Sequence, residues 1–281
     1  MNLGELRRYE FSPIEQSYSF KDAILYALSL GYDGACDEER RFVTENDQCV
    51  VPTFCNVLCH PGFWLRDVPQ LGFDWRRVLH GEQMLRILRP LPVAAAIRAQ
   101  HRIIAVEDRK EKGAVVYLEK TIELAASGEP LATARWTIFA RGDGGAGGFG
   151  ALPVSPAPLI AGEPEQAVEI AISPRAALLY RLSGDMNPIH ADPEAARQAG
   201  FDRPILHGLC TMGIACRAIL QAYCGSDPSR LKSMFVRFSQ PVFPGETVRV
   251  EFFREDTVLR FRVLVQARQA IVLDRGSAEI A

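Results

Sequence analysis

The stretch His207-Gly-Leu-Cys-Thr-Met-Gly-Ile-Ala-Cys-Arg-Ala-Ile-Leu-Gln-Ala-Tyr-Cys-Gly225 decides the fold. Its larger apolar residues recur at helical spacing, and alanine and isoleucine fill most of the other faces. A helix that is apolar nearly all round is a buried helix, and Gly225 is well placed to end it. The sequence therefore predicts a long buried helix in the C-terminal half of the chain.

The two halves of the chain resemble each other across a Gly- and Pro-rich stretch, 141–166, that is typical of a linker. Residues 23–29 align with 177–183, and Leu79-His80-Gly81 aligns with Leu206-His207-Gly208. Such self-similarity indicates a decayed duplication. Too few residues separate His80 from Pro90 for a second long helix. We therefore expect the first half to lack this helix and to keep an open groove in its place.

Segments with many β-branched and aromatic residues indicate strands in both halves. They are residues 114–117, 134–138, 248–253 and 259–265. Shorter helices are expected after Ser19, after Ser173 and after Asp192, where capping residues precede apolar ones. The predicted organisation is a repeat over 1–140, the linker over 141–166 and a second repeat over 167–281.

Composition excludes several classes of protein. The formal net charge is -2, which offers no basic field for nucleic acid. No run of apolar residues is long enough to cross a membrane, and the N-terminus does not read as a signal peptide. Seven cysteines without a framework spacing favour a reducing compartment. We expect a cytoplasmic protein that binds neither nucleic acid nor membrane.

The densest polar stretch, residues 183–192, lies between two of the expected helices and contains an Asn187-Pro188 turn signal. Such a turn can bring Asp185 and His190 to face one point. A carboxylate and an imidazole that converge on one water form a general acid/base pair near neutral pH, and Asn187 can orient that water. The alternative interpretation is structural, with Asp185 capping the turn and His190 capping the next helix.

Gly208 would lie at the amino end of the long helix, where unpaired N–H groups and the helix dipole favour developing negative charge. A thioester carbonyl placed there would gain stabilisation as it becomes an oxyanion. The alternative is a plain helix start.

These residues resemble the signature of the MaoC-like (R)-specific enoyl-CoA hydratases, also called hydratase 2. The matching pattern over Tyr180–Met212 is Tyr-x-x-Ser-Gly-Asp-x-Asn-Pro-x-His-x-Asp, then Ala-x-x-x-Gly-Phe, then Pro-Ile-Leu-His-Gly. The first half also fits, with Val51-Pro-Thr-Phe54, His80-Gly-Glu-Gln83 and Arg89-Pro-Leu-Pro92. The resemblance therefore covers essentially the whole chain.

The resemblance implies an α+β double hot-dog fold, with two curled antiparallel sheets and a long buried central helix only in the C-terminal half. It implies hydration of trans-2-enoyl-CoA to (R)-3-hydroxyacyl-CoA without a metal or redox cofactor. Asp185 and His190 would activate water, Asn187 would hold the geometry, and the Gly208 N–H would form the oxyanion hole. The substrate-binding residues it implies are His207, Tyr180, Phe201 and Leu209.

Two other functions stay open at this point: a thioesterase on the same scaffold and a non-catalytic acyl-CoA-binding subunit. The intact Asp185, Asn187 and His190 argue against both. The acyl group is not defined by the sequence, and a monomer and a homodimer are both compatible with it.

Three further motifs in the sequence carry weaker signals. The literal G-x-G-x-x-G at 142–147 precedes a Pro-rich stretch instead of a helix, which argues against a dinucleotide site. Cys55, Cys59 and His60 lack a second ligand pair at zinc-finger spacing, so we expect buried thiols. His80 is interpreted as a relic of the duplication.

Overall fold

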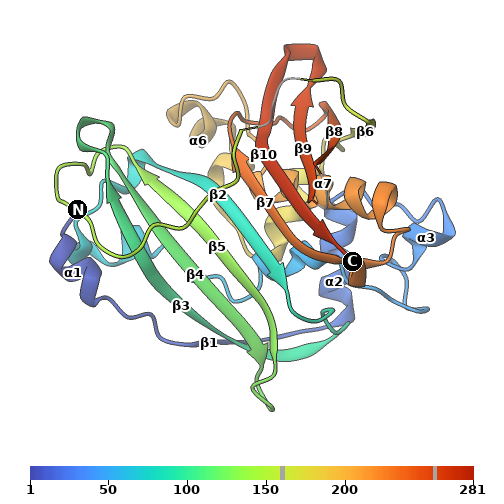
Figure 1. Ribbon diagram of the computed structural model, residues 1–281, viewed down its shortest axis with the longest axis horizontal. Coiled ribbons are helices and arrows are strands. Elements are labelled where there is room, and N and C mark those ends of the chain that lie inside the picture. The colour runs from blue at the N-terminus through green and yellow to red at the C-terminus, as the bar shows by residue number, and fades with distance from the viewer. Residues whose placement is uncertain (159–161, 256–257) are drawn as a thin grey trace.

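The computed structural model describes residues 1–158, 162–255 and 258–281. Within these ranges ten antiparallel strands form one continuous sheet (Figure 1). The first half supplies β1 (Ile14–Tyr18), β2 (Val78–Ile87), β3 (Ala95–Asp108), β4 (Ala114–Leu124) and β5 (Pro130–Ala140). The second half supplies β6 (Gln166–Ala171), β7 (Leu231–Phe238), β8 (Thr247–Glu255), β9 (Val258–Val265) and β10 (Ala270–Ile280). The four predicted strand segments fall within β4, β5, β8 and β9.

The strand order reveals the duplication. It runs β1-β3-β4-β5-β2-β7-β10-β9-β8-β6 across the sheet. Both halves have the same strand order when each is followed from its edge of the sheet to the centre. The first strand of the half in the sequence comes first, and its third, fourth, fifth and second strands follow. The halves meet where β2 pairs with β7, between Glu82↔Arg237 and Arg86↔Ser233. The predicted double hot-dog is thus confirmed, and its two sheets share backbone hydrogen bonds at this joint.

The helices are short apart from two. They are α1 (Leu3–Arg8), α2 (Phe20–Ser29), α3 (Asp37–Arg40), α4 (Trp64–Asp67), α5 (Ala176–Tyr180), α6 (Pro193–Gln198) and α7 (Gly208–Tyr223). Single 3-10 turns are η1 (Pro52–Asn56), η2 (Pro69–Leu71), η3 (Trp75–Arg77), η4 (Lys110–Lys112), η5 (Arg181–Ser183), η6 (Pro188–His190), η7 (Pro228–Arg230) and η8 (Gln266–Arg268). Helix α2 begins with the predicted Ser19 cap, whose backbone N–H donates to Asp22 Oδ2 at 2.7 Å. No described helix is both long and apolar enough to span a membrane.

Helix α7 confirms the prediction of a long buried helix. It has 16 residues, and 10 of them are buried. It packs against η1, β6, β7 and β10, so it lies between the two halves. Gly213 allows this close packing, because a Cβ there would lie 2.5 Å from Leu30 Cδ2 of the segment after α2. The next longest helix in the described ranges, α2, has 10 residues.

The predicted alignment of His80-Gly81 with His207-Gly208 is wrong. His80 and Gly81 lie inside strand β2, whereas His207 and Gly208 begin helix α7. In chain order the counterpart of α7 is the segment between α2 and β2, which forms short helical turns. The alignment was wrong because it rested on the tripeptide Leu-His-Gly, which occurs in both halves. Such a short match carries no information on whether the residues form a helix or a strand.

That segment covers the place where an open groove was expected. Residues 51–59, here called the roof, are all buried, and they form η1 and a following turn. The Lys120 ammonium on β4 donates to the carbonyls of Cys55 at 2.9 Å, Asn56 at 3.1 Å and Leu58 at 2.7 Å. These bonds satisfy carbonyls that a short 3-10 turn leaves unpaired. Cys55 and Cys59 are buried thiols, as predicted.

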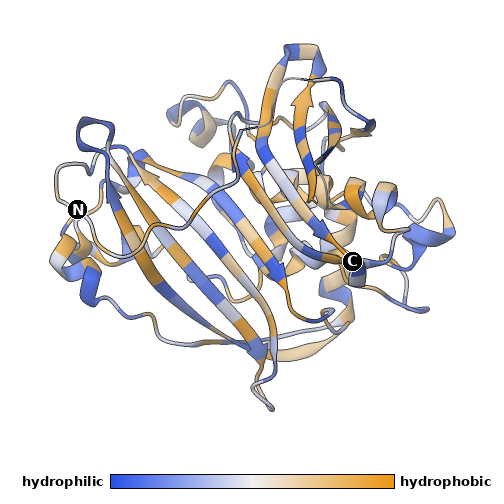
Figure 2. Cartoon of the chain, viewed as in Figure 1, coloured by the Kyte–Doolittle hydropathy of each residue, from blue (hydrophilic) through white to orange (hydrophobic). Residues whose placement is uncertain are grey.

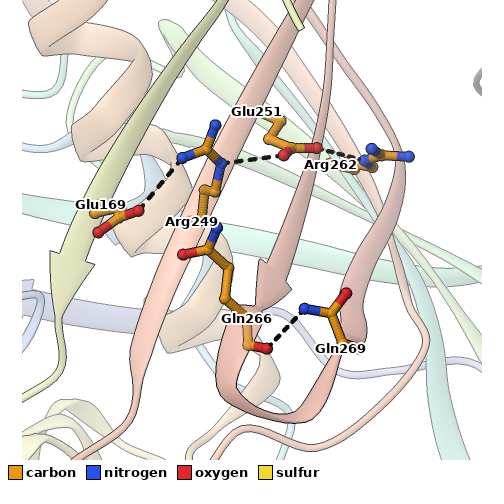
Figure 3. A network of polar contacts seen from close by, with 6 residues as sticks. All are labelled: Glu169, Arg249, Glu251, Arg262, Gln266 and Gln269. Atoms are coloured by element: carbon orange, nitrogen blue, oxygen red, sulfur yellow. Dashed lines mark hydrogen bonds and ion pairs between the residues drawn. The ribbon is translucent and has the colours of Figure 1, made fainter. Parts of the chain in front are cut away.

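Alternation of apolar and polar residues along β3, β4 and β5 gives the sheet an inner and an outer face (Figure 2). In the second half the outer face carries a row of ion pairs (Figure 3). Arg249 on β8 bonds to Glu169 on β6 at 3.3 Å and to Glu251 at 3.1 Å. Glu251 also accepts from Arg262 on β9 at 2.7 Å. The apolar core therefore lies on the inner face, where α7 packs.

The glycines of 142–147 bind a carboxylate of the chain itself. The backbone N–H groups of Gly145 and Gly147 donate to Asp108 at 2.8 and 3.0 Å. Together with the Lys110 N–H they lower the pKa of Asp108 to about 2. Beyond this loop, Phe149 pairs with Val106 of β3, so the first part of the predicted linker is fastened to the sheet. Residues 159–161 of that linker lie outside the described ranges.

Candidate active site

The turn between α5 and α6 sets the positions of Asp185 and His190. Gly184 follows η5 with a φ of 128°, a conformation that favours glycine. The Asp185 carboxylate then accepts the Asn187 N–H at 3.1 Å, and the Asn187 side chain accepts the Ile189 N–H at 3.3 Å. Each of these two residues closes a turn through its own side chain. Asn187 therefore acts on the local backbone here, and it brings His190 back towards Asp185.

His190 is buried, and its Nδ1 lies 2.8 Å from the carbonyl oxygen of Ile205. Because a carbonyl can only accept, Nδ1 carries the proton and donates it, which leaves Nε2 as the basic nitrogen. Burial lowers the pKa of His190, although the Ile205 carbonyl and the Asp185 carboxylate oppose this effect. The ring is therefore neutral near pH 7 and can take up a proton through Nε2.

His207 lies directly against this pair. Its Nε2–H donates to the backbone carbonyl of Asp185 at 3.1 Å. Its ring stacks on that of His190, with centroids 3.6 Å apart. Burial, followed by the neighbouring His190, lowers the pKa of His207 to about 4. The side chain thus holds the Asp185 loop through a neutral hydrogen bond.

By residue type, Asp185, His190 and His207 could hold a metal ion, since one ligand atom from each lies within 4.8 Å of the others. The geometry fits such a role poorly. The two imidazole planes are stacked and only 23° from parallel, so one ion cannot lie close to both rings and in the plane of each. Metal ligands instead converge on one point. One nitrogen of each ring is also engaged with a carbonyl.

Gly208 is the first residue of α7 and is exposed. Its N–H has no partner within the helix, because the first N–H groups of a helix point out of its end. A Cβ at this position would lie 3.0 and 3.1 Å from two ring carbons of Phe238 at the end of β7. Only glycine at position 208 therefore lets the first turn of α7 lie this close to the Phe238 ring. Sequence reasoning did not single out Phe238 as a packing partner.

The other predicted substrate-binding residues lie in different settings. Tyr180 is buried behind His207, with ring centroids 4.8 Å apart. Phe201 is half-buried at the end of α6, and its N–H donates to the Ala196 carbonyl at 2.9 Å. Leu209 is half-buried and packs against the main core. Of these three, Tyr180 alone has a ring contact with a residue of the Asp185 site.

The first half adds the His80 imidazole to this site. The His80 ring packs edge-on against Phe238, with centroids 4.7 Å apart. His60, next to the roof, and His80 are both exposed, and both lie within range of the Asp185 charge. His80 thus stands at the site, whereas the sequence had suggested a relic. The His80-Gly-Glu-Gln83 pattern was the signal that could have placed it there.

Comparison with protein families supports both halves separately. Residues 157–274 match the MaoC like domain, and residues 16–142 match the MFE-2 hydratase 2 N-terminal domain. Asp185, Asn187, His190, His207 and Gly208 fall in the first of these matches, and His80 falls in the second. The two matches together span most of the chain.

Relatives resemble the chain along its length. It is 37% identical to a probable enoyl-CoA hydratase 2 of Dictyostelium discoideum, over 100% of this chain and 97% of the relative. It is also 37% identical to the peroxisomal multifunctional enzyme type 2 of Drosophila melanogaster over 94% of this chain, which spans only 46% of that relative. The crystal structure of a MaoC-like dehydratase from Phytophthora capsici superposes with a TM-score of 0.89 and 31% identity, covering 100% and 99% of the two chains.

Proposed function

This chain belongs to the MaoC-like dehydratase family, and from that membership and its site we propose that it is a hydro-lyase that adds water to trans-2-enoyl-CoA. The product is the (R)-3-hydroxyacyl-CoA, and the reverse reaction is the dehydration. The observation that carries the proposal is the placement of Asp185 and a neutral His190 in one site, next to the amino end of α7.

In the proposed reaction, Asp185 and the His190 Nε2 hold the attacking water, and its oxygen bonds to C3 of the enoyl group while one proton passes from the water to this pair. The electrons of the double bond move towards the thioester carbonyl, whose oxygen becomes negatively charged. The Gly208 N–H and the helix dipole stabilise this oxygen. The proton is then delivered to C2, so the sum of the steps is the addition of one water molecule. The residues alone supply this chemistry, and we propose no metal or redox cofactor.

His207 has a supporting role in this proposal. Because its hydrogen bond goes to the Asp185 backbone and its ring lies against His190, it can fix both groups relative to each other. The substrate-binding roles of Tyr180, Phe201 and Leu209 stay predictions.

The test is the hydration of crotonyl-CoA, which is monitored by the loss of the conjugated thioester absorbance. A dehydrogenase specific for one 3-hydroxyacyl-CoA stereoisomer then identifies the product. We expect absorbance loss with (R) product. Release of free thiol without a hydroxyacyl product would instead indicate a thioesterase. A homodimer stays a prediction, which analytical ultracentrifugation tests.

A further inference from the structure

Tyr26 and Tyr180 occupy equivalent positions of the two repeats. Residues 23–29 align with 177–183, so Tyr26 of α2 corresponds to Tyr180 of α5. Their rings meet across the two halves, with centroids 5.7 Å apart and planes 51° from parallel. Both side chains are buried. The two halves therefore each place one large ring in the core, and the two rings are in contact.

Each tyrosine also packs against a later segment of its own half. The Tyr180 ring lies 4.8 Å from that of His207, the residue before α7. The Tyr26 ring lies 5.1 Å from that of Phe54 in the roof, and the roof has the place in chain order that α7 has in the second half. The two contacts are therefore counterparts, although the first half has no Asp-x-Asn-Pro-x-His pattern after Tyr26. The first half keeps the packing around the site without its acid/base residues.

These contacts are part of a longer series of rings, here called the ring column. All six of its side chains are buried, and its five ring contacts have centroid distances between 3.6 and 5.7 Å. In order, its members are Tyr18, Phe54, Tyr26, Tyr180, His207 and His190. The hydroxyl of Tyr18 donates to the Pro92 carbonyl at 2.7 Å, which fixes the outer end of the column. The inner end is the proposed catalytic histidine.

The column restricts the position of the His207 ring. This ring contacts both Tyr180 and His190, and its Nε2–H donates to the Asp185 carbonyl at 3.1 Å. Because protein interiors are close-packed, a buried ring can shift only when its neighbours shift. The placement of Asp185 relative to His190 therefore depends on Tyr180 and on the residues that hold Tyr180.

Tyr26 holds Tyr180 from the side of the first half. Its ring is 0% exposed and is in contact with Phe54 of the roof. Helix α7 also packs closely on it, because a Cβ at Gly213 would lie 3.2 Å from the Tyr26 hydroxyl oxygen. Tyr26 is thus enclosed by the roof, by α7 and by Tyr180, so it has little room to move.

We propose that Tyr26 is a positioning residue for the reaction, and that through Tyr180 and His207 it lets the first half set the geometry of Asp185 and His190. The inference rests on the proposed function for the identity of the reaction. Asp185 and His190 both belong to the second half, so the ring column gives the first half a part in catalysis that requires no contact between Tyr26 and the substrate.

The first test compares the hydration of crotonyl-CoA by Tyr26→Leu and by the native chain. Because a small misplacement of the reacting groups is costly, we expect kcat to fall by about 10–10²-fold. KM should change little, since the buried Tyr26 ring does not reach the substrate. Tyr26→Phe keeps the ring and should keep the native kcat. A loss in Tyr26→Phe as large as that in Tyr26→Leu would overturn the role assigned to the ring.

Phe252→Leu is the matched control. Phe252 of β8 is also 0% exposed, and among the described residues its ring contacts only Tyr223, which lies outside the ring column. The substitution removes a buried ring of similar size, so it measures the effect of a general loss of packing. It should leave kcat near the native value, and a fall in kcat equal to that of Tyr26→Leu would overturn the proposal.

A double mutant tests whether Tyr26 acts through His207. His207→Gln keeps an N–H donor for the Asp185 carbonyl but removes the ring that Tyr180 contacts. If the effect passes through His207, adding Tyr26→Leu to His207→Gln should cause little further loss of kcat. Losses that multiply in the double mutant would overturn the proposal.

A second measurement does not depend on activity. The chain has five histidines, so selective nitrogen-15 labelling of histidine gives a small set of imidazole signals. Tyr26→Leu should shift the signals of His190 and His207, and Phe252→Leu should leave them in place. Unchanged signals in a folded Tyr26→Leu would overturn the proposal. If Tyr26→Leu does not melt cooperatively, Phe54→Leu, one ring further out, decides by the same criteria. A native chain that does not hydrate crotonyl-CoA would contradict the proposed function, and the imidazole signals would still test the ring column.

Discussion

The imidazole of His207 lies against that of His190, with ring centroids 3.6 Å apart and planes 23° from parallel. Two rings at this distance cannot both carry a positive charge without strong repulsion. Each is also buried, which disfavours charge on either. Burial therefore keeps His190 in the neutral form that a general base requires, and the stack on His190 further lowers the pKa of His207.

This relationship predicts the acid limb of the pH–rate profile. The pKa of His190 is lowered, so the ring stays neutral below the ordinary histidine value of about 6.5 and gains a proton only at lower pH. The rate constant kcat/KM for crotonyl-CoA should be level near pH 7 and fall as the pH drops below about 6.5. An acid limb centred above pH 7 would contradict the assignment of His190.

The substitution Gly208→Ala tests the proposed role of the Gly208 N–H in catalysis. In Gly208→Ala the new methyl group would meet the Phe238 ring at about 3.0 Å, so the ring or the first turn of α7 must move. Because the Gly208 N–H is proposed to bind the oxyanion, we expect kcat to fall by roughly 10²-fold. Steady-state kinetics with crotonyl-CoA measure this loss.

A double mutant checks the cause. Phe238→Leu removes the ring carbons that the methyl group would meet, so it should restore part of the activity of Gly208→Ala. Equal losses in the single and the double mutant would show that Phe238 does not transmit the effect.

Lys120 predicts a loss of stability. Burial lowers its pKa to about 8, so it is still an ammonium at neutral pH. Lys120→Met keeps most of the length of the side chain but leaves three roof carbonyls without their donor. We expect the free energy of unfolding to fall by about 1–3 kcal/mol, measured by urea denaturation. Lys232→Met is the control, because Lys232 is exposed and, among the described residues, its ammonium bonds only to the Ser229 carbonyl, at 2.8 Å. A loss as large as that of Lys120→Met would refute the argument.

The sequence predicted the features that depend on local pattern. The apolar spacing of 208–223 predicted α7, and β-branched runs predicted strands such as β9. The Asp185 to His190 turn was also predictable, because Asn187 and Pro188 have strong turn preferences. In each case the residues within the segment determine its structure.

Features that depend on distant contacts were missed. The roof is held by Lys120, which lies 62 to 65 positions further along the chain from the carbonyls it binds. The stacking of His207 on His190 likewise requires α7 and the polar turn to meet in space. Nothing in the sequence next to His101 shows that its ring is buried beside those of Phe11 and Trp136.

The measurement that tests the account most directly is the turnover of crotonyl-CoA by Asp185→Asn beside the native chain. The amide keeps the shape of the carboxylate, and its oxygen can still accept the Asn187 N–H, so the fold and the Kd for a saturated acyl-CoA should be unchanged. Because one member of the proposed acid/base pair is lost, kcat should fall by about 10²–10⁴-fold. Hydration by a folded Asp185→Asn at the native rate would contradict the proposed active site.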